Sequence, residues 1–452
     1  MSNLNKFEDK SINKLIVEYS LPATIGMLMS FSYNIVDRMF VGNKLGAEAL
    51  TGVALVFPLQ VIVIGLASMI GIGANSNVSL SLGRKDKGAA EKFLGNAVSL
   101  SAIFPVISII IISIFFNGFL DLLGSYGSVR SYSASFLQIS MFGMIFQSIS
   151  MGSNNLIRAT GFPNIAMLTQ VIGAALNIVL DYIFIFVMDF GVEGAAIASN
   201  ISVFVSASWV ISFFFTKKSN LKIKLKYLKL HKRIMLPLLG NGFPSFITQV
   251  SGSFVVLLLN RQLINLGGHE GVAIMSIISG IEAFMFVPII GLSIGLRPII
   301  GYNFGAGNFQ RTKNIFLLGV YLALGIGFIS FLFLQIFSEQ LVTFFVPNDP
   351  NLIKIGASAM RIFTFFIYLV GLEIIVTMYY QSIGNAKIAA ITTLNRQLVF
   401  LLPLAFILPN FFGLTGIWYA GASSDLFSSI FSVSFIIMAV RRLSKMEIEK
   451  SK

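Results

Sequence analysis

Apolar stretches long enough to cross a membrane recur along almost the whole chain. A membrane-spanning helix needs about 20 mostly apolar residues. Only 11% of the residues are charged, against about 25% in soluble domains, so a soluble globular enzyme is excluded. The sequence predicts an all-α polytopic membrane protein with twelve transmembrane helices, over residues 20–41, 51–80, 93–116, 131–157, 164–188, 194–215, 237–266, 272–302, 314–337, 352–383, 386–408 and 416–440.

The basic residues fall on one side of this pattern. If the N-terminus is inside, 24 of the 32 lysines and arginines lie in inner segments, and only Lys44, Arg130 and Lys354 lie in outer loops. Because basic residues concentrate on the cytoplasmic side, we expect both termini in the cytoplasm. The net charge of +13 then reflects topology, with anionic membrane lipid as the partner and no nucleic acid.

Glycines and other residues recur at matching positions in the two halves of the chain. A constant shift of 222 residues aligns several glycines and other residues, among them Pro22 with Pro244, Gly73 with Gly295 and Gly83 with Gly305. Six spans in each half insert the same way, so the sequence predicts two six-helix lobes related by a parallel repeat, as in transporters that rock around a central site. We expect an amino-terminal lobe over 1–215, a basic cytoplasmic linker over 216–235 and a carboxyl-terminal lobe over 236–452.

Acidic residues at membrane depth are candidates for function, because ionisable groups are costly there. Tyr33 and Asp37 are four residues apart and share a helix face, as do Asn177 and Asp181. Two carboxylates with an amide and a phenol could share a proton, or their oxygens could hold Na⁺ at Asp37, Asn177 and Asp181. The alternative is that these side chains only make hydrogen bonds between helices.

The predicted second lobe also contains charges at depth. Glu282, Glu373 and Arg297 could form a second charge site, or these three residues and Arg396 could simply pair with one another. Asp425 could be a local cap or part of a relay. The sequence has no cysteine and only two histidines, one in the linker and one in a loop, so we expect no resident metal or other cofactor. No Asp-rich motif for an intramembrane pyrophosphate enzyme is present, so we expect a protein that is not an enzyme.

Several motifs spread over the chain resemble those of the multidrug and toxic compound extrusion family, in particular its prokaryotic DinF-like and MepA-like branch. The matching segments are Leu21-Pro22, Tyr33-x-x-x-Asp37, Arg158-Ala159-x-Gly161-x-Pro163, Asn177-x-x-x-Asp181, Gly191-x-x-Gly194-Ala195-Ala196, Pro298-Ile299-Ile300-Gly301-Tyr302-Asn303-x-Gly305-Ala306 and Gly413-Leu414-Thr415-Gly416.

This resemblance implies a V-shaped pair of lobes and a multi-pass protein of a prokaryotic plasma membrane. It implies export of diverse, often cationic or amphipathic, organic compounds in exchange for H⁺ or Na⁺ by alternating access, and we expect a functional monomer. It places the coupling site in the amino-terminal lobe, and the residues that match it here are Tyr33, Asp37, Asn177, Asp181 and Ser199, with Asn154 or Asn155 completing the network.

Two questions stay open in the sequence. Some family members have a second cation site built from acids of spans 7 and 10; Glu373 matches in span 10, but span 7 has no acid near 249–253. The alternative function is a lipid-linked oligosaccharide flippase of the same superfamily, which would need arginines lining a central cavity to bind pyrophosphate. Arg261, Arg297, Arg361 and Arg396 are the candidates for such a cavity.

Overall fold

The structure is a computed structural model that describes residues 6–451, and helices make up nearly all of that range. The first half contains α1 (Lys6–Asp9), α2 (Ile12–Leu45), α3 (Ala47–Gly83), α4 (Lys87–Ile114), α5 (Phe116–Leu122), α6 (Gly127–Ala159), α7 (Pro163–Asp181), the π-helical η1 (Tyr182–Val187) and α8 (Gly191–Phe213). The second half contains α9 (Lys232–Gly305), α10 (Phe309–Phe345), α11 (Pro350–Phe363), α12 (Ile367–Ser382), α13 (Ala386–Leu394), the π-helical η3 (Asn395–Leu401), α14 (Leu402–Ile407), α15 (Pro409–Phe412) and α16 (Leu414–Ser451).

Ten of the described helices are long and apolar enough to cross a membrane, and an eleventh span is formed if the bent pair α11 and α12 is counted as one.

α9 has 74 residues, which as a straight helix would measure about 110 Å. It breaks at Gly268, which has a φ of 59° and a ψ of −154°. Leu238 before the break and Tyr302 after it both pack on α3, so α9 folds back on itself.

Two predicted spans differ from single regular helices. The span predicted over 352–383 is interrupted between Phe363 and Ile367, where α11 and α12 meet at 46°. The Thr364 hydroxyl there donates to the carbonyl of Met360, a bond that competes with the helix ladder. The span predicted over 386–408 is divided into α13, η3 and α14, and the predicted outer loop before residue 131 contains the short helix α5.

The short linker between the halves contains the 3-10 turn η2 (Leu225–Tyr227) and packs beneath α4. Lys224 forms an ion pair with Glu91, and the Asn96 side chain donates to the carbonyl of Tyr227 at 3.0 Å. The hydrogen bond that Lys224 donates to the Glu91 carboxylate raises the pKa of Lys224. These contacts fix the linker to the first half of the molecule.

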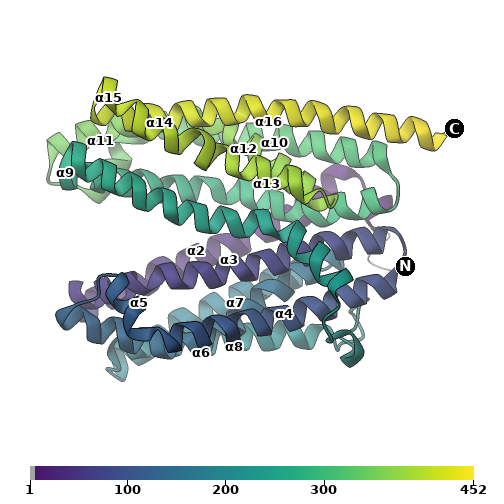
Figure 1. The fold of residues 1–452 in the computed structure, drawn as a ribbon, viewed down its shortest axis with the longest axis horizontal. Coiled ribbons are helices and arrows are strands. Elements are labelled where there is room, and N and C mark those ends of the chain that lie inside the picture. The colour runs from purple at the N-terminus through teal and green to yellow at the C-terminus, as the bar shows by residue number, and fades with distance from the viewer. Residues whose placement is uncertain (1–5, 452) are drawn as a thin grey trace.

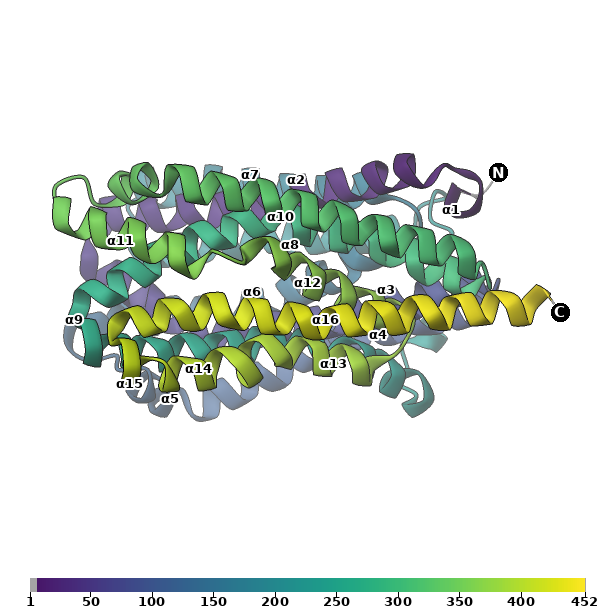
Figure 2. The same ribbon diagram turned by 90° about the horizontal axis from the view of Figure 1, so that it is seen from above.

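Helices before the linker gather in one layer and most helices after it in another, and both marked ends of the chain lie at the same end of the molecule (Figure 1). Seen from above, α10 and α16 run along nearly the whole length of the molecule (Figure 2). One buried apolar core, which includes Phe7, Leu82, Leu296 and Leu443, joins both halves at the end that holds the termini. Two further cores each contain residues of one half only. The halves are therefore packed together at one end and have separate cores at the other.

Glycines allow the backbones of the two halves to touch at the shared end. A Cβ atom at Gly242 of α9 would lie 1.7 Å from the carbonyl oxygen of Met69 in α3, and one at Gly73 of α3 would lie 1.9 Å from that of Leu238. Gly83 and Gly305 approach the opposite half in the same way. We call this contact of α2 and α3 with α9 the seam.

Replacing Gly242 by alanine is expected to lower stability by about 1–3 kcal/mol, because the added methyl group must separate two backbones. Gly240 is the matched control, since it lies two residues away in the same helix and a Cβ there would meet nothing within 4 Å. Gly240→Ala is expected to be neutral or slightly stabilising, because alanine favours helices over glycine. Thermal unfolding of the purified variants in detergent measures both effects, and equal melting temperatures would contradict the close packing of the seam.

Candidate functional site

Two carboxylates of the first half lie close together between α2 and α7. Asp181, the last residue of α7, is fully buried, and neither of its side-chain oxygens has a hydrogen-bond partner among the described residues. Asp37 of α2 also has one buried oxygen, Oδ1, without a partner. Phe40, three residues after Asp37, packs edge-on against Tyr182, the residue after Asp181, with 6.5 Å between ring centroids, and Tyr33 lies one helical turn before Asp37. Tyr33, Asp37 and Asp181 therefore belong to one site.

Asn177 and Ser199 lie on the α7 and α8 side of this site. The Asn177 side chain is buried, and its Nδ2 donates to Ser199 Oγ at 3.2 Å. Its Oδ1 has no hydrogen-bond partner among residues 6–451. Asn177 lies one helical turn before Asp181, so the amide oxygen adds a neutral acceptor to the two carboxylates. Oxygens of this kind can take up a proton or coordinate Na⁺.

The helix that carries Asp181 changes its winding directly after this residue. α7 continues into the π-helical segment η1, which begins at Tyr182. Such segments are often found at functional sites, because they shift the direction of neighbouring side chains. Phe186 in η1 packs edge-on against Phe40 of α2, which holds the two helices together beside the carboxylates.

The two asparagines of α6 have different surroundings. Asn154 is buried, and its Oδ1 accepts no hydrogen bond from any residue that the structure describes. Asn155 donates to the Met151 carbonyl, its Oδ1 accepts from Arg158, and its main-chain oxygen accepts from Asn75. No hydrogen bond between described residues joins either asparagine to Asp37 or Asp181. The free oxygen makes Asn154 the better candidate for a role in the site.

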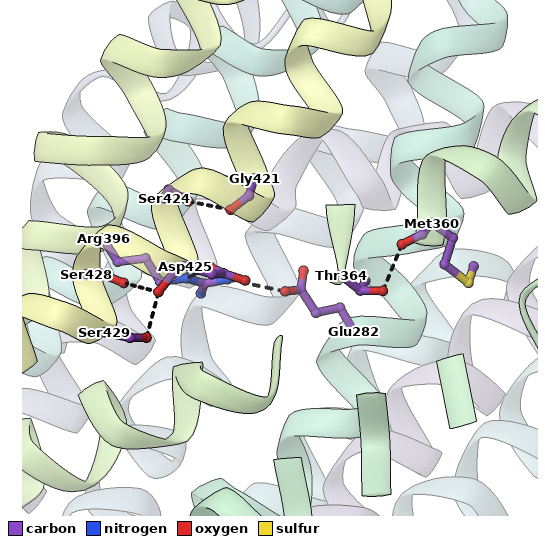
Figure 3. Close-up of polar contacts among 9 residues, drawn as sticks. All are labelled: Glu282, Met360, Thr364, Arg396, Gly421, Ser424, Asp425, Ser428 and Ser429. Carbon is purple, nitrogen blue, oxygen red and sulfur yellow. Dashed lines mark hydrogen bonds and ion pairs between the residues drawn. The ribbon is translucent and has the colours of Figure 1, made fainter. Parts of the chain in front are cut away.

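A second group of charges lies in the other half (Figure 3). Arg396 of η3 donates through Nε to Asp425 of α16 at 2.7 Å and through Nη2 to Glu282 of α9 at 3.2 Å. Glu373 of α12 is within electrostatic reach of Arg396, and its buried Oε2 has no hydrogen-bond partner in the part of the chain that the structure describes. One guanidinium is thus surrounded by three carboxylates from three helices. We call these four residues the second charge cluster.

Asp425 is the residue of this cluster whose role the sequence left undecided. The only sequence signal was an acid within an apolar span, which says nothing of its partner. Arg297 does not follow the expectation that these charges pair with one another. It makes no ion pair among the described residues, and its Nη2 donates to Gln381 at 3.2 Å. Pairing of second-half charges therefore describes Arg396 with Glu282, but not Arg297.

The four arginines considered for a pyrophosphate cavity share no common partner. Arg396 is paired with acids, and Arg297 bonds to Gln381. Arg361 is exposed and donates to Ser338 at 2.7 Å, and Arg261 is exposed. This arrangement gives no support to a flippase.

The chain matches one family model and many known proteins. The MatE family model matches residues 22–183 and 244–407. The multidrug export protein MepA of Staphylococcus saprophyticus is 26% identical over 439 residues, covering 97% of this chain and 96% of MepA. MepA of Staphylococcus aureus MW2 is 26% identical over 441 residues, with the same coverage.

Solved structures resemble the whole chain. A crystal structure of MATE in complex with MaL6 has a TM-score of 0.92 at 28% identity and covers 97% of this chain and 99% of that one. An outward-facing multidrug resistance MATE family transporter of the MOP superfamily has a TM-score of 0.91 at 27% identity, with 97% and 98% covered. A MOP superfamily transporter from Pyrococcus furiosus, described as having a binding pocket of reverse polarity that suggests a different function, has a TM-score of 0.90 at 27% identity, with 98% of both chains covered.

Proposed function

The chain belongs to the MatE family, and on that premise we propose that it is a multidrug exporter that moves cationic or amphipathic organic compounds out of the cell in exchange for H⁺ or Na⁺. The observation that carries the antiport proposal is the pair Asp37 and Asp181, whose three fully buried oxygens lack hydrogen-bond partners among residues 6–451. Two such carboxylates can bind a cation from one side of the membrane and release it to the other. The MepA relatives, named as multidrug export proteins, support the choice of cargo.

We propose twelve membrane spans in two lobes. The ten apolar helices become twelve when α9 is divided at Gly268 and the bent pair α11 and α12 is counted as one. The family model matches twice, from residue 22 and from residue 244, which is the shift of the sequence repeat. The lobes correspond to 1–215 and 236–452, with the basic linker 216–235 between them. An even number of spans places both termini on one side, and the basic residues make that side the cytoplasm.

We propose that the structure is in the outward-facing state. The shared core and the seam lie at the end that holds the termini, and the separate cores lie at the other end. The halves are then closed towards the cytoplasm and apart towards the outside. Alternating access requires the seam to open while the outer ends come together.

Ion uptake drives this exchange through the carboxylate pair. In the outward state Asp37 and Asp181 take up H⁺ or Na⁺, which neutralises the charge that holds a cationic compound. The compound leaves, the lobes rock, and the ion is released to the cytoplasm. A membrane potential of 100 mV adds about 2.3 kcal/mol for each charge moved. Asn177, Ser199, Tyr33 and Asn154 orient or complete the ion site in this scheme.

The second charge cluster has a different proposed role. Arg396 neutralises part of the charge of Glu282 and Asp425, so Glu373 is the residue with a free oxygen for a cation. We propose that coupling takes place in the first half and that the cluster stabilises the second. We further propose that the chain functions as a monomer, and that anionic lipid binds its basic cytoplasmic face.

Ethidium accumulation in bacterial cells without their own efflux pumps tests the function. Cells that express the chain should accumulate less dye than cells with an empty vector. The pH gradient and the Na⁺ gradient are then collapsed in separate experiments. Only one of the two treatments should abolish the difference in dye level, and that treatment identifies the coupling ion. Equal dye levels in both strains, with the protein present in the membrane, would refute drug export.

Ser199→Ala should slow efflux about fivefold, because loss of one hydrogen bond to Asn177 costs about 1 kcal/mol. Ser202 of the same helix is the control, since its hydroxyl donates to the Ala198 carbonyl of its own helix. Ser202→Ala should leave efflux unchanged. Initial rates of ethidium efflux at matched expression measure both, and equal rates for the two variants would remove Ser199 from the site.

A further inference from the structure

Two buried arginines at the seam have no acidic partner. Arg158 of α6 is 3% exposed and Arg297 of α9 is 6% exposed. Arg158 donates to Gln170 at 2.8 Å and to Asn155 at 3.4 Å, and Arg297 donates to Gln381 at 3.2 Å. All these acceptors are neutral amides. No described acid lies within ion-pair distance of either guanidinium, and both Nε atoms are buried without a hydrogen-bond partner.

The arginines approach the seam from opposite sides. On the first-half side, Gln170 packs against Gly26 of α2, and Asn155 packs against Gly71 of α3. On the second-half side, Arg297 lies one helical turn before Gly301, where a Cβ would lie 2.8 Å from Ser79 of α3. Ser79 lies one helical turn after Asn75, whose side chain donates to the main-chain carbonyl of Asn155 at 2.6 Å, so both arginines border the same part of α3. Closing the seam therefore brings two like charges into one enclosed region.

Such a pair requires negative charge from elsewhere. Arginine does not lose its proton in proteins, and an unpaired buried charge is strongly unfavourable. Mutual repulsion in a region of low dielectric adds to this cost. The amides of Gln170, Asn155 and Gln381 offer oxygen dipoles, but they cannot neutralise two guanidinium groups.

We propose that Arg158 and Arg297 form a binding site for a small inorganic anion of the size of chloride. The site differs from the carboxylate pair and from the second charge cluster. Both side chains are buried at the seam, so a lipid headgroup cannot reach them, and a small anion displaces the fewest of the packed side chains around the two buried Nε atoms. Because its two arginines come from the two halves, the bound anion stabilises the closed seam. This last consequence depends on the proposed alternating access.

Chloride should therefore shift the molecule towards the state with a closed seam. The chain has no cysteine, so spin labels can be attached at Lys87→Cys and Gln310→Cys, two exposed cytoplasmic positions on opposite halves. Electron paramagnetic resonance then measures the distance between them in detergent or nanodiscs. The closed-to-open ratio in sodium chloride is expected to exceed that in sodium gluconate of equal ionic strength about fivefold.

Variants of the two arginines separate this site from a general salt effect. Arg158→Gln and Arg297→Gln remove one charge and the repulsion with it, so each should stay closed in both salts. Arg361→Gln, which changes an exposed arginine outside the seam, should keep the chloride response. A thermal melt of wild type and variants in the two salts gives a second readout, in which chloride should raise the melting temperature only when both arginines are present.

Three results would overturn the proposal. These are an identical distance distribution of wild type in both salts, a chloride response that persists in both glutamine variants, and a response to sulfate or phosphate but not to chloride. Measuring ethidium efflux by the same wild-type protein distinguishes failure of the anion site from failure of the proposed drug export. Normal efflux with no chloride response would refute the anion site alone, and loss of efflux with an intact response would refute drug export alone.

Discussion

Asp181→Asn is expected to abolish ion-driven efflux while leaving the protein folded. The substitution keeps the size of the side chain but removes the charge that takes up H⁺ or Na⁺. Asp181 is fully buried and has no hydrogen-bond partner for either oxygen among the described residues, so no native bond is lost. Loss of coupling to one charge at 100 mV removes about 2.3 kcal/mol, or roughly 50-fold in the concentration ratio that the pump can sustain.

Asp37→Asn should have the same effect, because the two carboxylates belong to one site. The double variant should be no worse than either single variant, since residues that act as one unit are not additive. Asp121→Asn is the control, because this acid is paired with Arg130 at the surface, outside the site. Steady-state ethidium levels at matched expression measure the effect. Normal levels in Asp37→Asn and Asp181→Asn would show that the pair is structural.

Arg396→Met is expected to destabilise the second half by about 3–5 kcal/mol. Arg396 is held between Asp425 and Glu282, and its removal leaves buried carboxylates that repel one another, with Glu373 nearby. The melting temperature of the purified protein should fall clearly. Arg361→Met removes an exposed arginine with one hydrogen bond to Ser338 and should cost no more than about 1 kcal/mol.

A compensated variant shows whether charge is the cause. Arg396→Met combined with Asp425→Asn and Glu282→Gln removes the uncompensated carboxylates and should recover much of the lost stability, as replacing a whole buried ion pair often does. If Arg396→Met melts like Arg361→Met, the second charge cluster does not stabilise the fold. If the triple variant melts no higher than Arg396→Met, the loss comes from packing instead.

Hydropathy was sufficient to predict the class of protein, but it did not predict where the helices change their winding. Apolar runs mark where a chain can cross a bilayer, and the break in α9 at Gly268 lies in the gap between two predicted spans. The π-helical segments η1 and η3 left no comparable signal, because hydropathy reports how apolar a segment is and not how its helix is wound. The interruption after Phe363, where the Thr364 hydroxyl donates to the Met360 carbonyl, likewise left no mark in hydropathy.

The candidate site was predictable in part. Tyr33 with Asp37 and Asn177 with Asp181 could be grouped because four-residue spacing defines a helix face. That α2 and α7 bring the two faces together follows from tertiary packing. The partners of Arg396 are 29 and 114 residues away, beyond any local pattern. The preference for Asn154 over Asn155 as the candidate likewise rests on tertiary contacts, which bind Asn155 to Arg158 and Asn75.

Coupled transport by the purified protein tests the central claim most directly. Wild type and Asp181→Asn would be reconstituted into liposomes with ethidium outside, and a pH gradient or a Na⁺ gradient would be imposed separately. We expect wild type to move ethidium against its concentration gradient with one of the two ions, and Asp181→Asn to move none. Uphill transport by Asp181→Asn, or none by wild type with either gradient, would contradict the assignment of this carboxylate pair as the ion-coupling site.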